Sequence, residues 1–331
     1  MSSIFIGGGT PSLLSGEQIG QLMDRIREQF AMAQDAEITM EVNPGTASAE
    51  KLRNFYTAGI NRLSIGMQSA QAEELKNLGR IHDFEGFCQV YREAVEAGFT
   101  NINVDIMSGL PGQTLASYRD TLEKVLHLEP MPQHISAYSL IVEEGTPFAA
   151  MAERGELPLP EEETERAMYE ETIEVLSKYG FHRYEISNYA RDGYECRHNV
   201  GYWIRRDYLG FGIGAASLID NVRFQNEKSL GAYLAHPLES REEEQTLTVQ
   251  DRMEETMFLG LRLTRGVSCV DFAEQYGRTV EEVYGEVIAR NVADGLLTVT
   301  ERKENQKKDR FLALTKRGLD LSNYVMAQFL F

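Results

Sequence analysis

Short apolar runs alternate with amphipathic stretches through the first part of the chain. Apolar runs typical of buried strands cover residues 4–6, 37–42, 62–67, 101–107 and 134–141. Between them, apolar residues recur every three or four positions, as Ile19, Met23 and Ile26 do, which predicts helices with one buried face. Strands that alternate with helices predict a parallel sheet with right-handed crossovers, so we expect an α/β fold.

Glycine and polar residues gather at the carboxyl end of these predicted strands. The segments "GGGT", "EVNP", "QS" and "GLPG" each follow or end a strand. Ligands bind at this edge in barrels and open α/β sheets. Each residue alone has an ordinary explanation as a turn glycine, a solvated strand end or a helix cap. Four such ends on one rim together predict a shared pocket.

The motifs at these strand ends carry a family resemblance. "GGGTPS", "EVNPG", "GMQS", "LGRIH" and "VDIMSGLPGQT", in this order, resemble the radical S-adenosylmethionine proteins related to oxygen-independent coproporphyrinogen oxidase. The resemblance implies a partial (β/α)6 barrel of the radical-SAM type that holds S-adenosylmethionine across the strand ends. It assigns Gly8, Gly9 and Thr10 to the amino group and to backbone contacts of that ligand.

The same resemblance implies further polar contacts to the ribose, amino and carboxylate groups of S-adenosylmethionine. An arginine can pair with a carboxylate through two hydrogen bonds, and acidic side chains suit ribose hydroxyls or an ammonium group. The residues so assigned are Glu41, Gln68, Arg80 and Asp105.

The cysteines depart from the family pattern. Members carry a C-x3-C-x2-C loop after the first barrel strand that holds a [4Fe-4S] cluster, whereas the cysteines here are Cys88, Cys196 and Cys269. The sequence begins at what looks like the second barrel strand, so we expect a barrel that lacks its first strand and a cluster only in the full-length family member. The chain as given is then expected to be catalytically inert. We favour loss of an N-terminal segment over a natural cluster-free relative.

A second group of notable residues lies at "HNVGYW", which includes the single tryptophan of the chain. The imidazole of His198 can ligate iron, while the rings of Tyr202 and Trp203 can cover a flat apolar ligand. The alternative is that the aromatic rings are core residues and His198 only makes hydrogen bonds. The motif resembles the signature of the haem-chaperone branch of the family, which implies haem binding through His198, Asn199, Tyr202 and Trp203, with His198 as the metal ligand.

Two points in this region stay open. Cys196 lies two positions before His198 and competes as an axial ligand, because thiolates also bind haem iron. His182 and the nearby tyrosines and arginines are candidates for contacts to haem propionates, and the sequence singles out none of them.

The last part of the chain has a different pattern. Helical segments at residues 249–263, 269–277 and 280–295 precede two short strands and a last helix from Lys316, which resembles a winged-helix module. We therefore divide the chain into a radical-SAM-type partial barrel (1–180), a connecting region with the haem motif (181–247) and a winged-helix-like domain (248–331). From Asp251 onward, 12 Lys and Arg face 13 Asp and Glu, and only residues 302–310 are markedly basic. DNA binding needs a stronger basic surface, so this module is expected to dock protein or cover the barrel.

The net charge of the whole chain disfavours some classes of binding partner. A formal charge of −18 disfavours nucleic acid and anionic membranes, which are themselves polyanions. No apolar run approaches the roughly 18 residues needed for a membrane span, so we expect no stable membrane insertion and a cytoplasmic protein. The expected partners are haem and a haem-accepting protein of unknown identity.

Three functions remain open. The first is a haem chaperone that delivers haem to acceptor proteins and, when full length, binds S-adenosylmethionine and a [4Fe-4S] cluster. The second is an oxygen-independent coproporphyrinogen III oxidase, a radical enzyme that decarboxylates porphyrinogen propionates. The third is a barrel enzyme that binds a phosphorylated metabolite at glycine-rich loops, for which "GFGIGAAS" is a weak candidate.

Overall fold

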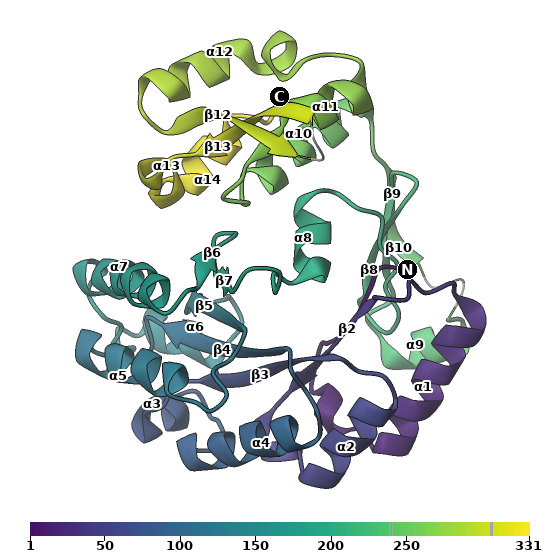
Figure 1. Ribbon diagram of the computed structural model, residues 1–331, viewed down its shortest axis with the longest axis vertical. Coiled ribbons are helices and arrows are strands. Elements are labelled where there is room, and N and C mark those ends of the chain that lie inside the picture. Colours follow the sequence, from purple (N-terminus) through teal and green to yellow (C-terminus); the bar gives the residue numbers. More distant parts are fainter. Residues whose placement is uncertain (238, 240, 305–306) are drawn as a thin grey trace. The chain divides into compact units, whose positions relative to one another are not determined.

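One seven-stranded sheet, in the order β1-β2-β3-β4-β5-β7-β6, forms the centre of the N-terminal part of the chain (Figure 1). The computed structural model describes residues 1–237, 239, 241–304 and 307–331. Strands β1 to β5 pair in parallel, as the sequence predicted, and the α/β fold is confirmed. Their bounds are Ser3–Ile6, Glu37–Val42, Arg62–Gln68, Ile102–Ser108 and His134–Ser139.

Sequence analysis missed two further strands of this sheet. Strands β7 (Asn188–Ala190) and β6 (His182–Arg183) continue the sheet beyond β5 in antiparallel pairing. They contain three and two residues, which is too few for a period of two to be visible in the sequence. Because β7 pairs with β5, the segment that precedes His198 lies next to the sheet.

Helices connect the parallel strands and run along one side of the sheet (Figure 1). The side chains of Ser15 and Thr114 start two of them in capping boxes with Gln18 and Ser117. Ile19 and Met23 are fully buried, as their spacing predicted. The bounds are η1 Pro11–Leu13, α1 Gly16–Gln29, η2 Pro44–Thr46, α2 Ala49–Thr57, α3 Ala72–Asn77, α4 Phe84–Glu96, α5 Leu115–Leu126, α6 Pro147–Glu153 and α7 Glu162–Lys178.

The two faces of the parallel sheet have opposite chemistry. Successive strand residues point to opposite faces, and the apolar set packs in the main core, for example Ile38, Leu63 and Val104. The residues between them are almost all polar on β2 to β5. That second face carries Glu37, Thr39, Glu41, Arg62, Ser64, Asn103, Asp105, His134, Ser136 and Tyr138. Burying one face against helices therefore collects these polar groups on the other.

The chain divides into two compact units, Met1–His198 and Asn199–Phe331, and the division falls inside helix α8 (Arg197–Trp203). Our sequence-based boundaries after residues 180 and 247 stay a prediction. Within the described part of the chain, no helix is both long and apolar enough to cross a membrane.

The described residues of the second unit form two small sheets. One has the order β10-β9-β8 and the other β11-β13-β12. Three helices precede the β12–β13 hairpin, as the sequence predicted, and the basic segment 302–310 includes residues 305 and 306, which lie outside the described residues. The bounds are β8 Ala216–Ile219, β9 Val222–Asn226, α9 Leu230–Ala235, β10 Arg241–Thr246, α10 Val249–Gly260, β11 Val267–Ser268, α11 Cys269–Tyr276, α12 Val280–Ala293, β12 Leu297–Glu304, β13 Lys307–Leu314, α13 Lys316–Asp320 and α14 Ser322–Ala327.

Candidate functional site

The glycine turn after β1 packs against Glu41 on the neighbouring strand. The backbone N–H of Gly8 donates to Oε2 of Glu41 at 3.2 Å, and Gly8 and Gly9 have φ of 78° and 63°, where glycine is favoured. A Cβ at Gly7 would lie 2.7 Å from the ring of Phe5 and 3.0 Å from Cδ of Glu41. The glycines therefore serve both a left-handed turn and a close approach to Glu41, and the turn itself is exposed.

Tyr138 joins several of the predicted rim residues. Its hydroxyl donates to Oε1 of Gln68 at 2.9 Å, and the charges of Asp105, Arg80 and Glu41 all act on it. Burial is the main reason that the pKa of Tyr138 is raised, so its proton stays available for donation. Four of the residues that the resemblance assigned thus surround one phenol that the sequence did not point to.

Gln68 holds an uncommon backbone conformation at the end of β3. Its φ is 69° although it is not a glycine, and the pairing with β4 shifts register between Gly66 and Gln68. The side chain is 4% exposed. Such conformations persist where the surrounding structure enforces them, and they concentrate at functional sites.

Asp105 lies in a network of hydrogen-bond donors on the polar face. Nδ2 of Asn103 donates to its carboxylate at 2.7 Å, and the hydroxyl of Ser64 also donates to it, while the hydroxyl of Ser136 donates to Oδ1 of Asn103 at 3.2 Å. Burial nevertheless raises the pKa of Asp105. Burial also raises the pKa of Glu41, against the Gly8 hydrogen bond and with help from the charge of Asp105. A positively charged ligand would stabilise the ionised form of both carboxyl groups.

A chain of hydrogen bonds continues from Asp105 along the polar face. Oδ1 of Asn103 lies 2.6 Å from Nδ1 of His134, and Nε2 of His134 lies 2.9 Å from the hydroxyl of Tyr184. That hydroxyl accepts the backbone N–H of Cys196 at 3.3 Å. The rim with Asp105 and the start of helix α8 therefore belong to one buried polar network within the first unit.

Glu37, which is 5% exposed, caps the start of helix α8. Its carboxylate accepts the backbone N–H groups of Arg197 at 3.0 Å and of His198 at 3.1 Å, and Sγ of Cys196 lies 3.5 Å from it. The first N–H groups of a helix have no partner in the helix, and a carboxylate there also complements the helix dipole. Glu37 thus fixes the position of His198.

The imidazole of His198 lies against β1. It stacks on the ring of Phe5 with centroids 4.9 Å apart and planes at 22°, and its Nδ1 is 3.5 Å from Oγ of Ser3. Burial lowers the pKa of His198, and the charge of Arg62 lowers it further, against the opposing effect of Glu37. The ring is therefore neutral near pH 7, which is the form that ligates metals.

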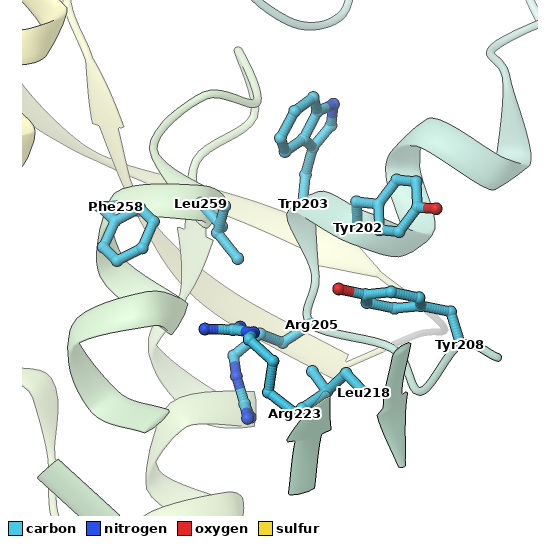
Figure 2. Close-up of a pocket in the computed structure, with 8 residues that line it drawn as sticks. All are labelled: Tyr202, Trp203, Arg205, Tyr208, Leu218, Arg223, Phe258 and Leu259. Atoms are coloured by element: carbon cyan, nitrogen blue, oxygen red, sulfur yellow. The ribbon is translucent and has the colours of Figure 1, made fainter. Parts of the chain in front are cut away.

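Tyr202 and Trp203, at the end of α8, line a cavity of about 340 Å³ in the second unit (Figure 2). The indole Nε1–H of Trp203 is buried and has no hydrogen-bond partner among the described residues, and the guanidinium of Arg262 lies 4.2 Å from its ring centroid. Tyr202 meets Tyr208 edge to face at 4.7 Å. The lining residues are Tyr202, Trp203, Arg205, Tyr208, Leu218, Arg223, Phe258 and Leu259. Aromatic faces, an unpaired indole donor and arginines fit a flat anionic ligand.

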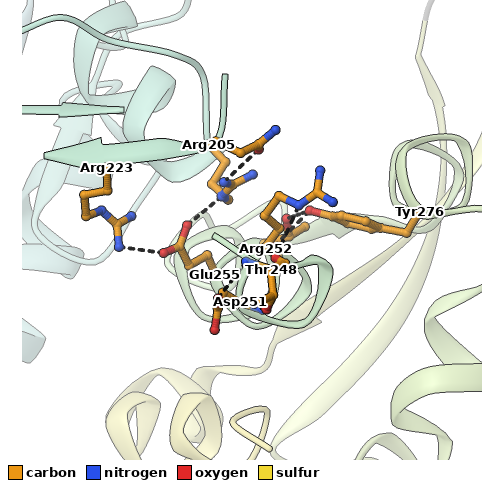
Figure 3. Close-up of polar contacts among 9 residues, drawn as sticks. Arg205, Arg223, Thr248, Asp251, Arg252, Glu255 and Tyr276 are labelled. Atoms are coloured by element: carbon orange, nitrogen blue, oxygen red, sulfur yellow. Dashed lines mark hydrogen bonds and ion pairs between the residues drawn. The ribbon is translucent and has the colours of Figure 1, made fainter. Parts of the chain in front are cut away.

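A buried carboxylate organises the two arginines of this cavity (Figure 3). Oε2 of Glu255 accepts Nε of Arg205 at 2.6 Å, and Oε1 accepts Nη1 of Arg223 at 2.7 Å. Burial alone would lower the pKa of Arg223, but the hydrogen bond and charge of Glu255 raise it, so it stays a cation. Arg205 also donates to Asn221 at 3.3 Å.

The remaining predicted residues are placed as follows. Thr10 precedes η1 and makes no side-chain capping bond, while Asn199 lies partly buried in the first turn of α8. Arg80 is partly exposed and donates its backbone N–H to Leu75. Cys196 is fully buried beside Glu37.

The described residues contain no group of three or more His, Cys, Asp or Glu side chains arranged to hold a metal ion. Cys88 and Cys269 are partly buried, and burial raises the pKa of both thiols. The described side chains therefore do not fit an iron–sulfur cluster.

Sequence reasoning missed Glu37, Tyr138 and Arg223, and it included Arg205 only among the arginines near His198 without singling it out. A signal existed for the first two, because Glu37 and Tyr138 alternate with apolar residues on β2 and β5 and share the polar face. Arg205 and Arg223 had no such signal, because only the tertiary fold brings them to the same carboxylate.

Comparisons with known proteins agree with this architecture. A family model described as the Radical SAM superfamily matches residues 1–125, and one described as the HemN C-terminal domain matches residues 247–321. The solved structure of coproporphyrinogen III oxidase (HemN) from Escherichia coli, a radical SAM enzyme, gives a TM-score of 0.82 at 25% identity over 99% of this chain and 77% of that one. The fold is thus a radical SAM α/β domain followed by a HemN-type C-terminal domain.

Individual relatives define the family more closely. Heme chaperone HemW of Bacillus subtilis (strain 168) is 39% identical over 100% of this chain and 86% of its own length. Heme chaperone HemW of Lactococcus lactis (strain IL1403) is 36% identical over 100% of this chain and 85% of its own length. The chain belongs to the HemW family.

Proposed function

We propose that this protein binds haem through the segment His198–Trp203 and delivers it to acceptor proteins. The HemW relatives are named heme chaperones, which supports this proposal. The observation that carries the proposal is the cavity beside Tyr202 and Trp203, where aromatic faces and two arginines meet. A porphyrin is flat, largely apolar and carries two propionates. The haem-accepting protein is part of this proposal and its identity stays open.

His198 is the preferred ligand for the haem iron. Its imidazole is neutral near pH 7 and partly accessible, whereas the thiol of Cys196 is fully buried beside the Glu37 carboxylate. Neutral imidazole is a common haem ligand, and a thiol must lose its proton before it can bind iron, which a neighbouring carboxylate opposes. Asn199, Tyr202 and Trp203 are assigned to the surroundings of the porphyrin.

S-adenosylmethionine is proposed to bind at the rim of the parallel sheet. The raised pKa values of Glu41 and Asp105 indicate carboxyl groups that a cationic ligand would stabilise, and S-adenosylmethionine carries a sulfonium and an ammonium group. The residues assigned to it are Gly8, Gly9, Thr10, Glu41, Gln68, Arg80 and Asp105. A [4Fe-4S] cluster remains an expectation for the full-length family member.

A haem titration followed by visible absorbance tests the proposal. We expect a saturable Soret band near one equivalent that His198→Ala abolishes and Cys196→Ala retains. His127→Ala, which removes an exposed histidine, is the matched control and should bind like the parent chain. Absence of saturable binding in the folded parent chain would refute the haem site.

Delivery needs a separate measurement. The haem-loaded chain is mixed with an apo haem protein, such as apomyoglobin, as a probe acceptor. A transfer rate that rises with acceptor concentration supports active delivery. A rate equal to spontaneous haem dissociation at all acceptor concentrations would reduce the protein to a haem binder.

The likeness to coproporphyrinogen III oxidase favours a second candidate, radical decarboxylation of coproporphyrinogen III. Because the cluster is expected only in the full-length protein, that form is incubated with S-adenosylmethionine, a reductant and coproporphyrinogen III, and detection of released carbon dioxide separates the two functions. Turnover would make the oxidase the better assignment.

A further inference from the structure

The cavity in the second unit has a positively charged lining, although the protein as a whole is acidic. The chain carries a formal charge of −18, yet the only charged residues among the eight that line the cavity are Arg205 and Arg223. An acidic protein repels an anionic ligand at long range, so such a ligand needs cations at the point of contact. The composition of this lining therefore points to an anion.

The two arginines have different roles because their environments differ. The side chain of Arg205 is 4% exposed and donates to Glu255 and Asn221, so it is closed to a ligand by burial. The side chain of Arg223 is 38% exposed and is held by the other oxygen of Glu255, and the nearby Tyr208 hydroxyl favours its charged form by raising its pKa. Arg205 thus fixes Glu255, and Glu255 fixes Arg223 at the cavity.

Arg223 keeps donors for a ligand. A guanidinium has five N–H groups in a planar fork, and the ion pair of Arg223 with Glu255 leaves others that can take a carboxylate. Because Glu255 already holds the side chain, little further ordering is needed when a ligand binds. A planar, pre-positioned cation of this kind is suited to a carboxylate.

We propose that Arg223, with the Tyr208 hydroxyl beside it, binds a propionate carboxylate of the porphyrin, while Tyr202, Trp203 and Phe258 contact the adjoining edge of the ring. This inference rests on the proposed haem function and deepens it. Figure 2 shows the aromatic side chains of Tyr202 and Tyr208 on one side of the cavity and Phe258 with Leu259 on the other. The volume of about 340 Å³ is at the low end for small-molecule sites, which suits an edge rather than a whole porphyrin.

The test compares haem with haem dimethyl ester, in which both carboxylates are blocked and the iron is unchanged. Binding of each to the full chain is followed by the Soret band and by quenching of the single tryptophan, Trp203. We expect the parent chain to bind the ester about tenfold or more weakly, as loss of a charge-assisted hydrogen bond predicts. In Arg223→Gln, haem should bind as weakly as the ester does, so that the ratio of the two dissociation constants falls to about one.

Arg310→Ala is the matched control, because Arg310 is a half-exposed, ion-paired arginine of the same unit, bound to Glu281. It should keep the parent ratio. Equal binding of haem and its ester by the parent chain, or an Arg223→Gln variant that keeps the parent ratio, would overturn the inference while leaving the haem function intact. If neither porphyrin binds saturably, the proposed function fails and this inference fails with it. The ester comparison on the parent chain does not depend on how well any variant folds.

Discussion

The buried carboxylate of Glu37 accepts the backbone N–H of His198 at 3.1 Å, although the two residues are 161 positions apart. Glu37 lies on the polar face of β2, and His198 lies in the first turn of α8. The same carboxylate accepts the backbone N–H of Arg197. A residue of the sheet therefore determines where the imidazole lies, and the imidazole in turn stacks on Phe5 of β1.

Replacing Glu37 by Gln should destabilise the protein and weaken haem binding. The amide keeps only one acceptor oxygen and turns a donor toward the helix N–H groups, so the free energy of unfolding should fall by about 1–3 kcal/mol. Urea unfolding measures this. Asp35→Asn is the control, because Asp35 forms an exposed ion pair with Arg197 that solvent screens, so its loss should change the free energy of unfolding little. Equal effects of the two substitutions would contradict the capping role.

A methyl group at Gly7 should disturb the rim. In Gly7→Ala the new Cβ would press on Phe5 and on the Glu41 side chain, so we expect a loss of about 1–3 kcal/mol in the free energy of unfolding and weaker binding of S-adenosylmethionine. Thermal unfolding and calorimetric titration report the two effects. Gly20→Ala in helix α1, where a Cβ meets nothing within 4 Å, should be neutral or stabilising by up to about 1 kcal/mol. If Gly7→Ala changed neither the free energy of unfolding nor the affinity for S-adenosylmethionine, the close approach of Gly7 to Phe5 and Glu41 would not matter for either.

Tyr138→Phe should weaken S-adenosylmethionine binding without a large loss of stability. The substitution removes the hydrogen bond to Gln68 and leaves the ring in place, so affinity should fall by about 0.5–1.5 kcal/mol, or roughly three- to tenfold. Isothermal titration calorimetry measures it. Tyr179→Phe, at a half-exposed tyrosine after α7, is the control and should bind like the parent. Unchanged affinity in Tyr138→Phe would remove Tyr138 from the proposed site.

The stability of the protein should fall below pH 6.5, in part through His134. Burial, with the charge of Arg62 adding to it, lowers the pKa of His134 well below its usual 6.5. Below that pH the unfolded chain binds a proton that the folded chain does not, so this contribution is complete above pH 6.5 and declines as the pH falls, by up to about 1.4 kcal/mol per pH unit.

Urea unfolding of His134→Gln between pH 7 and pH 5 checks this prediction. The variant cannot titrate at this position, so its free energy of unfolding should depend less steeply on pH than that of the parent chain. His127→Gln, at an exposed histidine, should keep the parent slope. Parallel curves for the parent chain and His134→Gln would show that His134 does not carry this pH dependence.

Much of the first unit could be predicted from the sequence. Apolar runs and the spacing of Ile19 and Met23 gave the parallel strands and a buried helix face, because burial of one face imposes a period that the sequence must carry. The candidate rim followed from the fold, since parallel strands end on the same edge. Tyr138 was missed because the pattern of β5 was read only for its apolar residues.

What the sequence determined by itself was therefore the class of fold, the strand-end motifs and the "HNVGYW" segment, since each depends on neighbours in the chain. Only the tertiary structure decided that Glu37 caps the helix of His198, that Tyr138 reaches Gln68, and that Glu255 holds both Arg205 and Arg223. The residues of each pair are distant in sequence, and their hydrogen bonds and ion pairs produce no periodic pattern in the sequence. Their partners are fixed by the pairing of strands and the packing of helices, which a local pattern does not contain.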